Sequence, residues 1–138
     1  MKPRLFLRLA ALCILIHLIG HLFGHFSWKE TPDPAKQEVI RQMTGPKFEF
    51  MGVMRSMGDY FEGYGLILFI VYGMSIALIL SAMRYSDSNH DIARKVLTPI
   101  GIGFLAMGGI EFVYFFPFAA SLSLGAGIFI ILAIFLNG

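Results

Sequence analysis

Four apolar stretches, each about as long as a bilayer is thick, constrain this chain more than any other feature of its sequence. A membrane-spanning helix needs about 20 mostly apolar residues to cross ~30 Å of hydrocarbon. Stretches that meet this requirement cover residues 5–26, 61–83, 96–116 and 118–136. We therefore expect an all-α fold in which residues 1–138 form a single transmembrane domain, a polytopic four-helix bundle.

The composition agrees with a membrane protein and argues against a nucleic-acid-binding one. Hydrophobic residues make up 57% of the 138 residues and charged residues only 14%, whereas soluble domains average about 45–50% and about 25%. The net charge of +2 is small and spread along the chain, so no basic surface for nucleic acid is indicated. The single cysteine, Cys13, lies inside an apolar run, which excludes a disulfide and a thiolate metal cluster.

The long connection, residues 27–60, is expected to contain a short helix. Asp33 is suited to the N-cap, Pro34 to the first helical position, and Gly45 to the position after a helix over residues 35–44. Beyond this helix, apolar residues recur at helical spacing and are expected to lie on the membrane surface or under the mouth of the bundle: Phe50, Met51, Met54, Met57 and Phe61.

The third and fourth spans are expected to form a tight hairpin. Pro117 interrupts an apolar block that is otherwise too long for one span. Proline inside a helix removes a backbone hydrogen bond and clashes with the preceding turn, so a helix that reaches Pro117 is expected to end before it. Glycine and serine residues on both sides of this break are expected to mark the close contact of the two helices. These residues are Gly101, Gly103, Gly108, Gly109, Ser121, Gly125 and Gly127.

The distribution of lysine and arginine predicts the orientation in the membrane. Six of the eleven lie in short segments at the N-terminus and between the second and third spans, whereas five are diluted over the long connection. Short segments rich in these residues remain in the cytoplasm. Both termini are therefore expected inside, with residues 27–60 outside.

Polar residues of the first span fall on one helical face. His17, Gly20, His21, Gly24 and His25 are spaced by three or four residues, which places them along a single stripe. Polar groups inside a bilayer usually face the interior of a bundle. The two glycines, Gly20 and Gly24, are therefore expected to let another helix backbone approach closely.

Carboxylates from two other spans fall at the same membrane depth as these histidines. Asp59 and Glu62 are three residues apart at the start of the second span, and Glu111 lies near the outer end of the third. With the expected orientation, His17, His21, His25, Asp59, Glu62 and Glu111 all lie in the outer half of the bundle. The inner half is almost purely apolar.

Three interpretations of this cluster remain open. A metal ion can bind two histidines one turn apart, such as His21 with His17 or His25, with Glu111 or Glu62 as the carboxylate ligand. Haem is disfavoured because its two histidines normally come from different helices, although a histidine paired with Met54 or Met57 is an alternative. The cluster could instead be a proton-active pocket for a lipid-like ligand such as a quinone. The third interpretation is a hydrogen-bonded network that fixes helix packing.

The first half of the chain resembles a group of short bacterial membrane proteins of unknown function. The resemblance rests on the segment 17–21 (His-Leu-Ile-Gly-His), on Trp28, and on segments 56–59 (Ser-Met-Gly-Asp) and 62–65 (Glu-Gly-Tyr-Gly). These proteins look like the DoxX-type four-helix proteins in size and topology. The resemblance implies four helices and a bacterial inner-membrane location. With the orientation expected from lysine and arginine, the long connection then lies in the periplasm. It implies no activity and no site residue.

Two functions from different classes follow from these observations. The chain shows no nucleophile triad, phosphate loop or carboxylate pair at glycosidase spacing, so an enzyme is not favoured. The first expectation is a small accessory subunit that packs with other membrane subunits of a respiratory or transport complex. The alternative is an independent membrane protein that binds a metal ion or a lipid-like ligand at the polar cluster.

Overall fold

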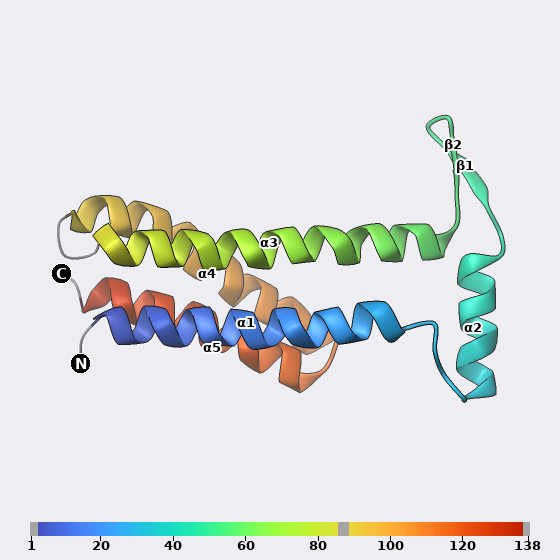
Figure 1. Cartoon of the computed structure of the whole chain (residues 1–138), viewed down its shortest axis with the longest axis horizontal. Coiled ribbons are helices and arrows are strands. Elements are labelled where there is room, and N and C mark those ends of the chain that lie inside the picture. Colours follow the sequence, from blue (N-terminus) through green and yellow to red (C-terminus); the bar gives the residue numbers. More distant parts are fainter. Residues whose placement is uncertain (1–2, 86–88, 137–138) are drawn as a thin grey trace. The chain divides into compact units, whose positions relative to one another are not determined.

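The computed structural model describes residues 3–85 and 89–136 (Figure 1). Within them the chain is predominantly helical, with one short β-hairpin between the second and third helices. The elements are α1 (Pro3–Ser27), α2 (Pro34–Thr44), β1 (Phe48–Phe50), β2 (Val53–Arg55), α3 (Met57–Tyr85), α4 (His90–Tyr114) and α5 (Pro117–Phe135).

Four of these helices, α1, α3, α4 and α5, are long and apolar enough to cross a membrane. The expected all-α bundle with four spans is therefore confirmed. Side chains satisfy backbone groups at helix ends: the Asn89 side-chain Oδ1 atom accepts a hydrogen bond from the Ile92 amide at 3.2 Å at the beginning of α4. Pro117 occupies the first turn of α5, so only Phe115 and Phe116 separate α4 from α5, as expected for a tight hairpin.

The helix predicted in the long connection is present as α2. The Asp33 carboxylate caps it by accepting a hydrogen bond from the Ala35 amide at 2.9 Å, and Pro34 begins the first turn. Gly45 follows the helix but keeps a right-handed φ of −78°. Glycine is favoured at this position because there is no room for a side chain: a Cβ would lie 2.9 Å from the Arg41 carbonyl oxygen. On the surface of α2, hydrogen bonds from Arg41 hold the pKa of the Glu38 carboxyl well below its usual range.

Helical spacing wrongly predicted the structure that follows α2. Residues Phe48–Phe50 and Val53–Arg55 form an antiparallel hairpin in which Phe50 is opposite Val53. Its two-residue turn has positive φ at both positions, 51° at Met51 and 83° at Gly52, as a type I′ turn requires. The glycine at the second turn position and the alternating strand residues overrode the helical pattern.

The described chain divides into two compact units. The four-helix unit comprises Met1–Ile19 and Tyr72–Gly138, and the loop unit comprises Gly20–Val71. α1 and α3 are continuous helices, and each contributes to both units. The buried core of the four-helix unit combines large side chains such as Leu7, Ile79 and Ile130 with many alanines.

The contact between α4 and α5 depends on glycine. A Cβ at Gly108 would lie 2.6 Å from Leu124 Cγ, and one at Gly127 would lie 2.9 Å from the Gly101 carbonyl oxygen. The predicted close contact is therefore confirmed at these positions. By contrast, a Cβ at Gly103 or Gly109 would meet no described atom within 4 Å. Among the other residues predicted for this contact, Gly125 faces Cys13 of α1 and the Ser121 hydroxyl hydrogen-bonds within α5.

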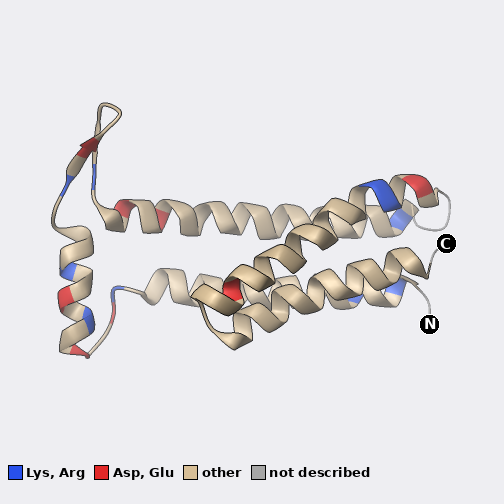
Figure 2. Cartoon of the chain, turned by 180° about the vertical axis from the view of Figure 1, so that it is seen from behind, with Lys and Arg blue, Asp and Glu red and all other residues tan. Residues whose placement is uncertain are grey.

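Basic residues of the four-helix unit gather at one end of its helices (Figure 2). Arg4 and Arg8 lie in the first turns of α1, Arg84 in the last turn of α3, and Arg94 and Lys95 near the start of α4. These helices run alternately up and down, which brings all five residues to the end where α3 finishes and α4 begins. Lys2, which also entered the predicted orientation, lies outside the described residues.

Candidate functional site

A buried polar cluster in the four-helix unit receives one side chain from each of the four long helices. His17 of α1 lies at its centre. The His17 Nε2 atom lies 3.2 Å from the hydroxyl oxygen of Tyr72 in α3, and its Nδ1 atom lies 3.2 Å from that of Ser123 in α5. Tyr72 and Ser123 are each only 1% exposed. Hydrogen bonds across helices in hydrocarbon therefore fix the imidazole orientation.

Glu111 of α4 completes this cluster. Its Oε1 atom lies 3.5 Å from His17 Nε2, and the residue is only 6% exposed. The second oxygen, Oε2, is buried and finds no hydrogen-bond partner among the described residues. A buried polar atom without a partner is costly, typically by about 1–3 kcal/mol. Glu111 therefore retains hydrogen-bonding capacity at Oε2.

The geometry of His17 allows two proton arrangements. With the proton on Nδ1, the imidazole donates to the Ser123 hydroxyl oxygen and accepts from the Tyr72 hydroxyl at Nε2. With the proton on Nε2, the imidazole is directed toward Glu111 Oε1, and Nδ1 accepts from the Ser123 hydroxyl. Because hydroxyl groups rotate, either state forms without movement of a heavy atom. The His17 imidazole can therefore carry its proton on either ring nitrogen.

A second polar cluster lies in the loop unit and centres on Glu62 of α3. Its Oε1 atom lies 2.5 Å from Lys29 Nζ and accepts a hydrogen bond from Trp28 Nε1 at 3.4 Å. Its Oε2 atom lies 3.8 Å from His25 Nε2. These three partners belong to the end of α1 and the residues directly after it. Glu62 therefore ties the end of α1 to the beginning of α3.

His21 and His25 pack against the same short segment of α3. The His21 Nε2 atom lies 3.1 Å from the Gly65 carbonyl oxygen. Both imidazoles contact the ring of Phe69, with centroid separations of 4.9 Å for His21 and 5.2 Å for His25. Gly65 is needed for this approach, because a Cβ there would overlap the His25 ring. The two histidines therefore act as packing residues within the loop unit.

Asp59 has a local structural role. Its Oδ2 atom accepts a hydrogen bond from the Ser56 amide at 2.8 Å, and its own amide donates to the Ser56 hydroxyl oxygen at 3.1 Å. This reciprocal pair is a capping box, which satisfies backbone donors at the beginning of α3. The Asp59 carboxylate is thereby engaged in capping the beginning of α3, where its hydrogen-bond partner is Ser56.

The structure thus distributes the six predicted site residues over four arrangements, of which the capping box of Asp59 is one. His17 lies with Glu111 in the four-helix unit, and His25 lies with Glu62 in the loop unit. The His21 Nε2 atom lies beside a backbone carbonyl oxygen, and the metal site predicted around His21 with Glu111 or Glu62 stays a prediction. Within residues 3–85 and 89–136, no group of three or more His, Cys, Asp or Glu side chains is placed to hold a metal ion.

No described helix of this chain covers Gly20 and Gly24, where a close helix contact was predicted. Both glycines are exposed, and a Cβ at either position would meet no described heavy atom within 4 Å. The histidines of the same stripe reach neighbouring helices with long side chains, and this leaves the backbone at the glycines uncovered. The backbone approach in this region occurs instead at Gly65.

Two residues of the buried cluster, Tyr72 and Ser123, were not predicted. Their signal was present in the sequence, because each is a polar side chain within an apolar span. Tyrosine and serine are common in spans, so their presence alone does not indicate a site. Their contacts with His17 identified these two residues. Each became recognisable once His17 was placed against it.

Comparisons with protein-family models, with curated proteins and with solved structures find no match to this chain. The resemblance to DoxX-type proteins stays a prediction.

Proposed function

We propose that this protein is an accessory subunit of a larger membrane assembly, in which α1 packs against a neighbouring subunit through Gly20 and Gly24. The supporting observation is the uncovered glycine face: both residues are exposed, and neither meets a described atom of this chain within 4 Å. Glycines four residues apart let a second helix backbone approach closely in lipid. Exposure of the same face to acyl chains gives no comparable packing.

The contrast with the rest of the chain supports this proposal. Side chains of the α4–α5 contact occupy the space beside three glycines, Gly101, Gly108 and Gly127. Internal packing in this protein therefore does use glycine. The chain also buries little of each span: between 22% and 39% of the most apolar 18-residue stretch of each long helix is buried. Most of the helical surface is therefore available to lipid and to other subunits.

The proposed location is a bacterial inner membrane, with both termini in the cytoplasm and residues 27–60 in the periplasm. The gathering of basic residues at one end of the four-helix unit supports this orientation. The same end contains the starts of α1 and α4 and the ends of α3 and α5.

Native electrophoresis of membranes solubilised in mild detergent tests the subunit proposal. The tagged chain should migrate in a discrete species much larger than its own 15.4 kDa. The pair Gly20→Leu and Gly24→Leu should abolish this species while leaving the helical circular-dichroism signal intact, because no described residue occupies the added volume. Gly103→Leu, at an equally open position on α4, should leave it unchanged. A wild-type chain that migrates alone, or equal effects of both changes, contradicts the proposal.

A second function is favoured by the unpartnered Oε2 atom of Glu111. An independent membrane protein could use this atom to accept a hydrogen bond from a lipid-soluble ligand, such as a hydroquinone, or to coordinate a metal ion together with His17. Organic extraction and elemental analysis of the purified protein test it. A stoichiometric ligand or metal lost in Glu111→Gln, and retained in Glu62→Gln, supports the binding function. Identical extracts from all three proteins contradict it.

A further inference from the structure

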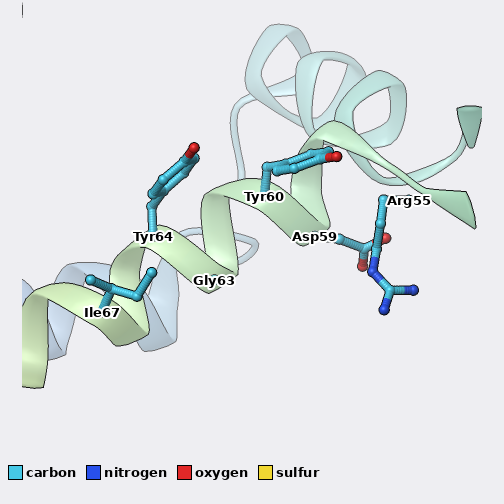
Figure 3. Close-up of a pocket in the computed structure, with 6 residues that line it drawn as sticks. All are labelled: Arg55, Asp59, Tyr60, Gly63, Tyr64 and Ile67. Carbon is cyan, nitrogen blue, oxygen red and sulfur yellow. The ribbon is translucent and has the colours of Figure 1, made fainter. Parts of the chain in front are cut away.

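A pocket of about 170 Å³ lies where the β-hairpin joins α3 (Figure 3). All of its lining residues belong to the loop unit. They are Arg55 from the last position of β2 and Asp59, Tyr60, Gly63, Tyr64 and Ile67 from the first turns of α3. A water molecule occupies about 30 Å³ in the liquid, so the pocket is large enough for a charged group of several heavy atoms.

The polar end of the pocket has an excess of positive charge. Arg55 donates a hydrogen bond to the Met54 carbonyl oxygen at 3.1 Å, which leaves most of its guanidinium N–H groups available. The neighbouring Asp59 carboxylate is held by the Ser56 amide. Lys47 also lies close enough to interact electrostatically with Asp59. Lys47 and Arg55 both act electrostatically on Asp59, so two cations face one carboxylate, although of the two only Arg55 lines the pocket.

The other end of the pocket continues along the apolar surface of a spanning helix. Tyr64 is 66% exposed and Ile67 is 54% exposed. Tyrosines at the beginning of a spanning helix are typical of the headgroup level of a bilayer, where the ring is apolar and the hydroxyl is hydrated. Gly63 forms an open floor between them, because a Cβ there would meet no described atom within 4 Å.

We propose that this pocket binds the headgroup of an anionic glycerophospholipid. The phosphate diester lies against Arg55, whose planar guanidinium forms paired hydrogen bonds with phosphate oxygens. The tyrosine hydroxyls point away from the Arg55 guanidinium (Figure 3), so the acyl chain lies along Gly63 and Ile67, beside the exposed ring of Tyr64. The mixture of a cationic end with an apolar end fits a lipid better than a free anion.

The test measures binding of soluble short-chain lipids to the full-length protein in detergent. Dioctanoyl phosphatidylglycerol is the anionic probe, dioctanoyl phosphatidylcholine the zwitterionic one, and inorganic phosphate represents the free anion. Wild-type protein should bind the phosphatidylglycerol at least tenfold more tightly than the other two probes. Arg55→Gln should weaken this binding about tenfold, as expected for loss of about 1.4 kcal/mol from a charged hydrogen bond.

Gly63→Leu provides a test that preserves every charge. Leucine fills the pocket floor without a neighbour to displace, so the variant should fold and lose the lipid at least tenfold. Gly73→Leu, an equally open position further along α3, is the matched control and should bind as wild type does. Unchanged binding in both Arg55→Gln and Gly63→Leu overturns the proposal. Equally tight binding of inorganic phosphate identifies a free-anion site instead, and if Gly63→Leu fails to fold, Arg55→Gln alone decides.

Discussion

The Nδ1 atom of His17 lies 3.2 Å from the hydroxyl oxygen of Ser123, although 106 positions separate the two residues in the sequence. The contact joins the first long helix to the last one. Tyr72 and Glu111 add the other two helices at the opposite ring nitrogen. The His17 imidazole can make all of these contacts only when the four helices are assembled in the correct register.

Loss of either hydroxyl partner of His17 should destabilise the protein measurably. Tyr72→Phe and Ser123→Ala each remove one buried hydrogen bond, with an expected cost of about 1 kcal/mol in the free energy of unfolding. Reversible unfolding in a mixed detergent measures this cost. Ser121→Ala is the control on the same helix, because that hydroxyl is exposed and bonds only to the Phe118 carbonyl oxygen. Equal effects at positions 121 and 123 would remove Ser123 from the cluster.

Removal of both His17 and Glu111 should be less harmful than removal of His17 alone. His17→Leu removes the imidazole partner of the buried Glu111 carboxyl, with an expected cost of about 3 kcal/mol. His17→Leu combined with Glu111→Leu replaces the pair by apolar groups and should restore at least half of that loss. The same unfolding assay applies. Additive losses would show that the two residues do not interact.

The α4–α5 contact should distinguish glycines that look alike in the sequence. Gly127→Ala places a methyl group 2.9 Å from a backbone oxygen that cannot rotate away, and overpacking of this kind costs about 1–3 kcal/mol. Gly103→Ala meets no described atom and should be neutral or slightly stabilising, because alanine favours helix over glycine. Thermal unfolding followed by circular dichroism compares the two. A reversed order of stability would place the helix contact on another face.

Two glycines near the start of α3 should behave in opposite ways. Gly65→Ala inserts a methyl group into the His25 ring and should lower stability by about 1–3 kcal/mol. Gly63→Ala, two positions earlier, enters open space and should be tolerated. The near-ultraviolet signal of Trp28 is a local reporter, because its indole contacts Glu62 and Phe61 in the same unit. An unchanged signal in Gly65→Ala would contradict the packing described for His25.

Cysteine labelling tests the predicted orientation. In a Cys13→Ala background, a cysteine at Gln37 should react with a membrane-impermeant maleimide in intact cells, and one at His90 should react only after lysis. Both positions are exposed on the surface of the chain. Ser88, which would otherwise serve on the inner side, lies outside the described residues. The opposite labelling pattern would reverse the topology and place the loop unit in the cytoplasm.

Features that depend on one segment were predictable from the sequence. The four spans follow from length and hydropathy, and α2 follows from Asp33 and Pro34, because these determinants act within a few residues. The hairpin was missed because Phe50, Met54 and Met57 imitate helical spacing. The turn geometry imposes a positive φ on Met51, and methionine is not a residue type whose presence predicts a positive φ.

The candidate site was predictable in its members but not in its pairings. Buried histidines and carboxylates in apolar spans identify themselves, because the cost of burying them requires a partner. Which partner each one finds depends on helix rotation and on the distance along each axis. His21 and His25 are both histidines, one helical turn apart on the same face of α1. Nevertheless, His21 faces the Gly65 carbonyl and His25 faces Glu62.

The link between α4 and α5 bears on how this protein enters the membrane. Because only Phe115 and Phe116 lie between the two helices, no hydrophilic segment can remain in water while α4 crosses alone. The glycine contacts at Gly108 and Gly127 are already available to the pair before any other helix arrives. During biosynthesis, α4 and α5 should therefore leave the translocation machinery together, as a preassembled helical hairpin against which α1 and α3 complete the bundle.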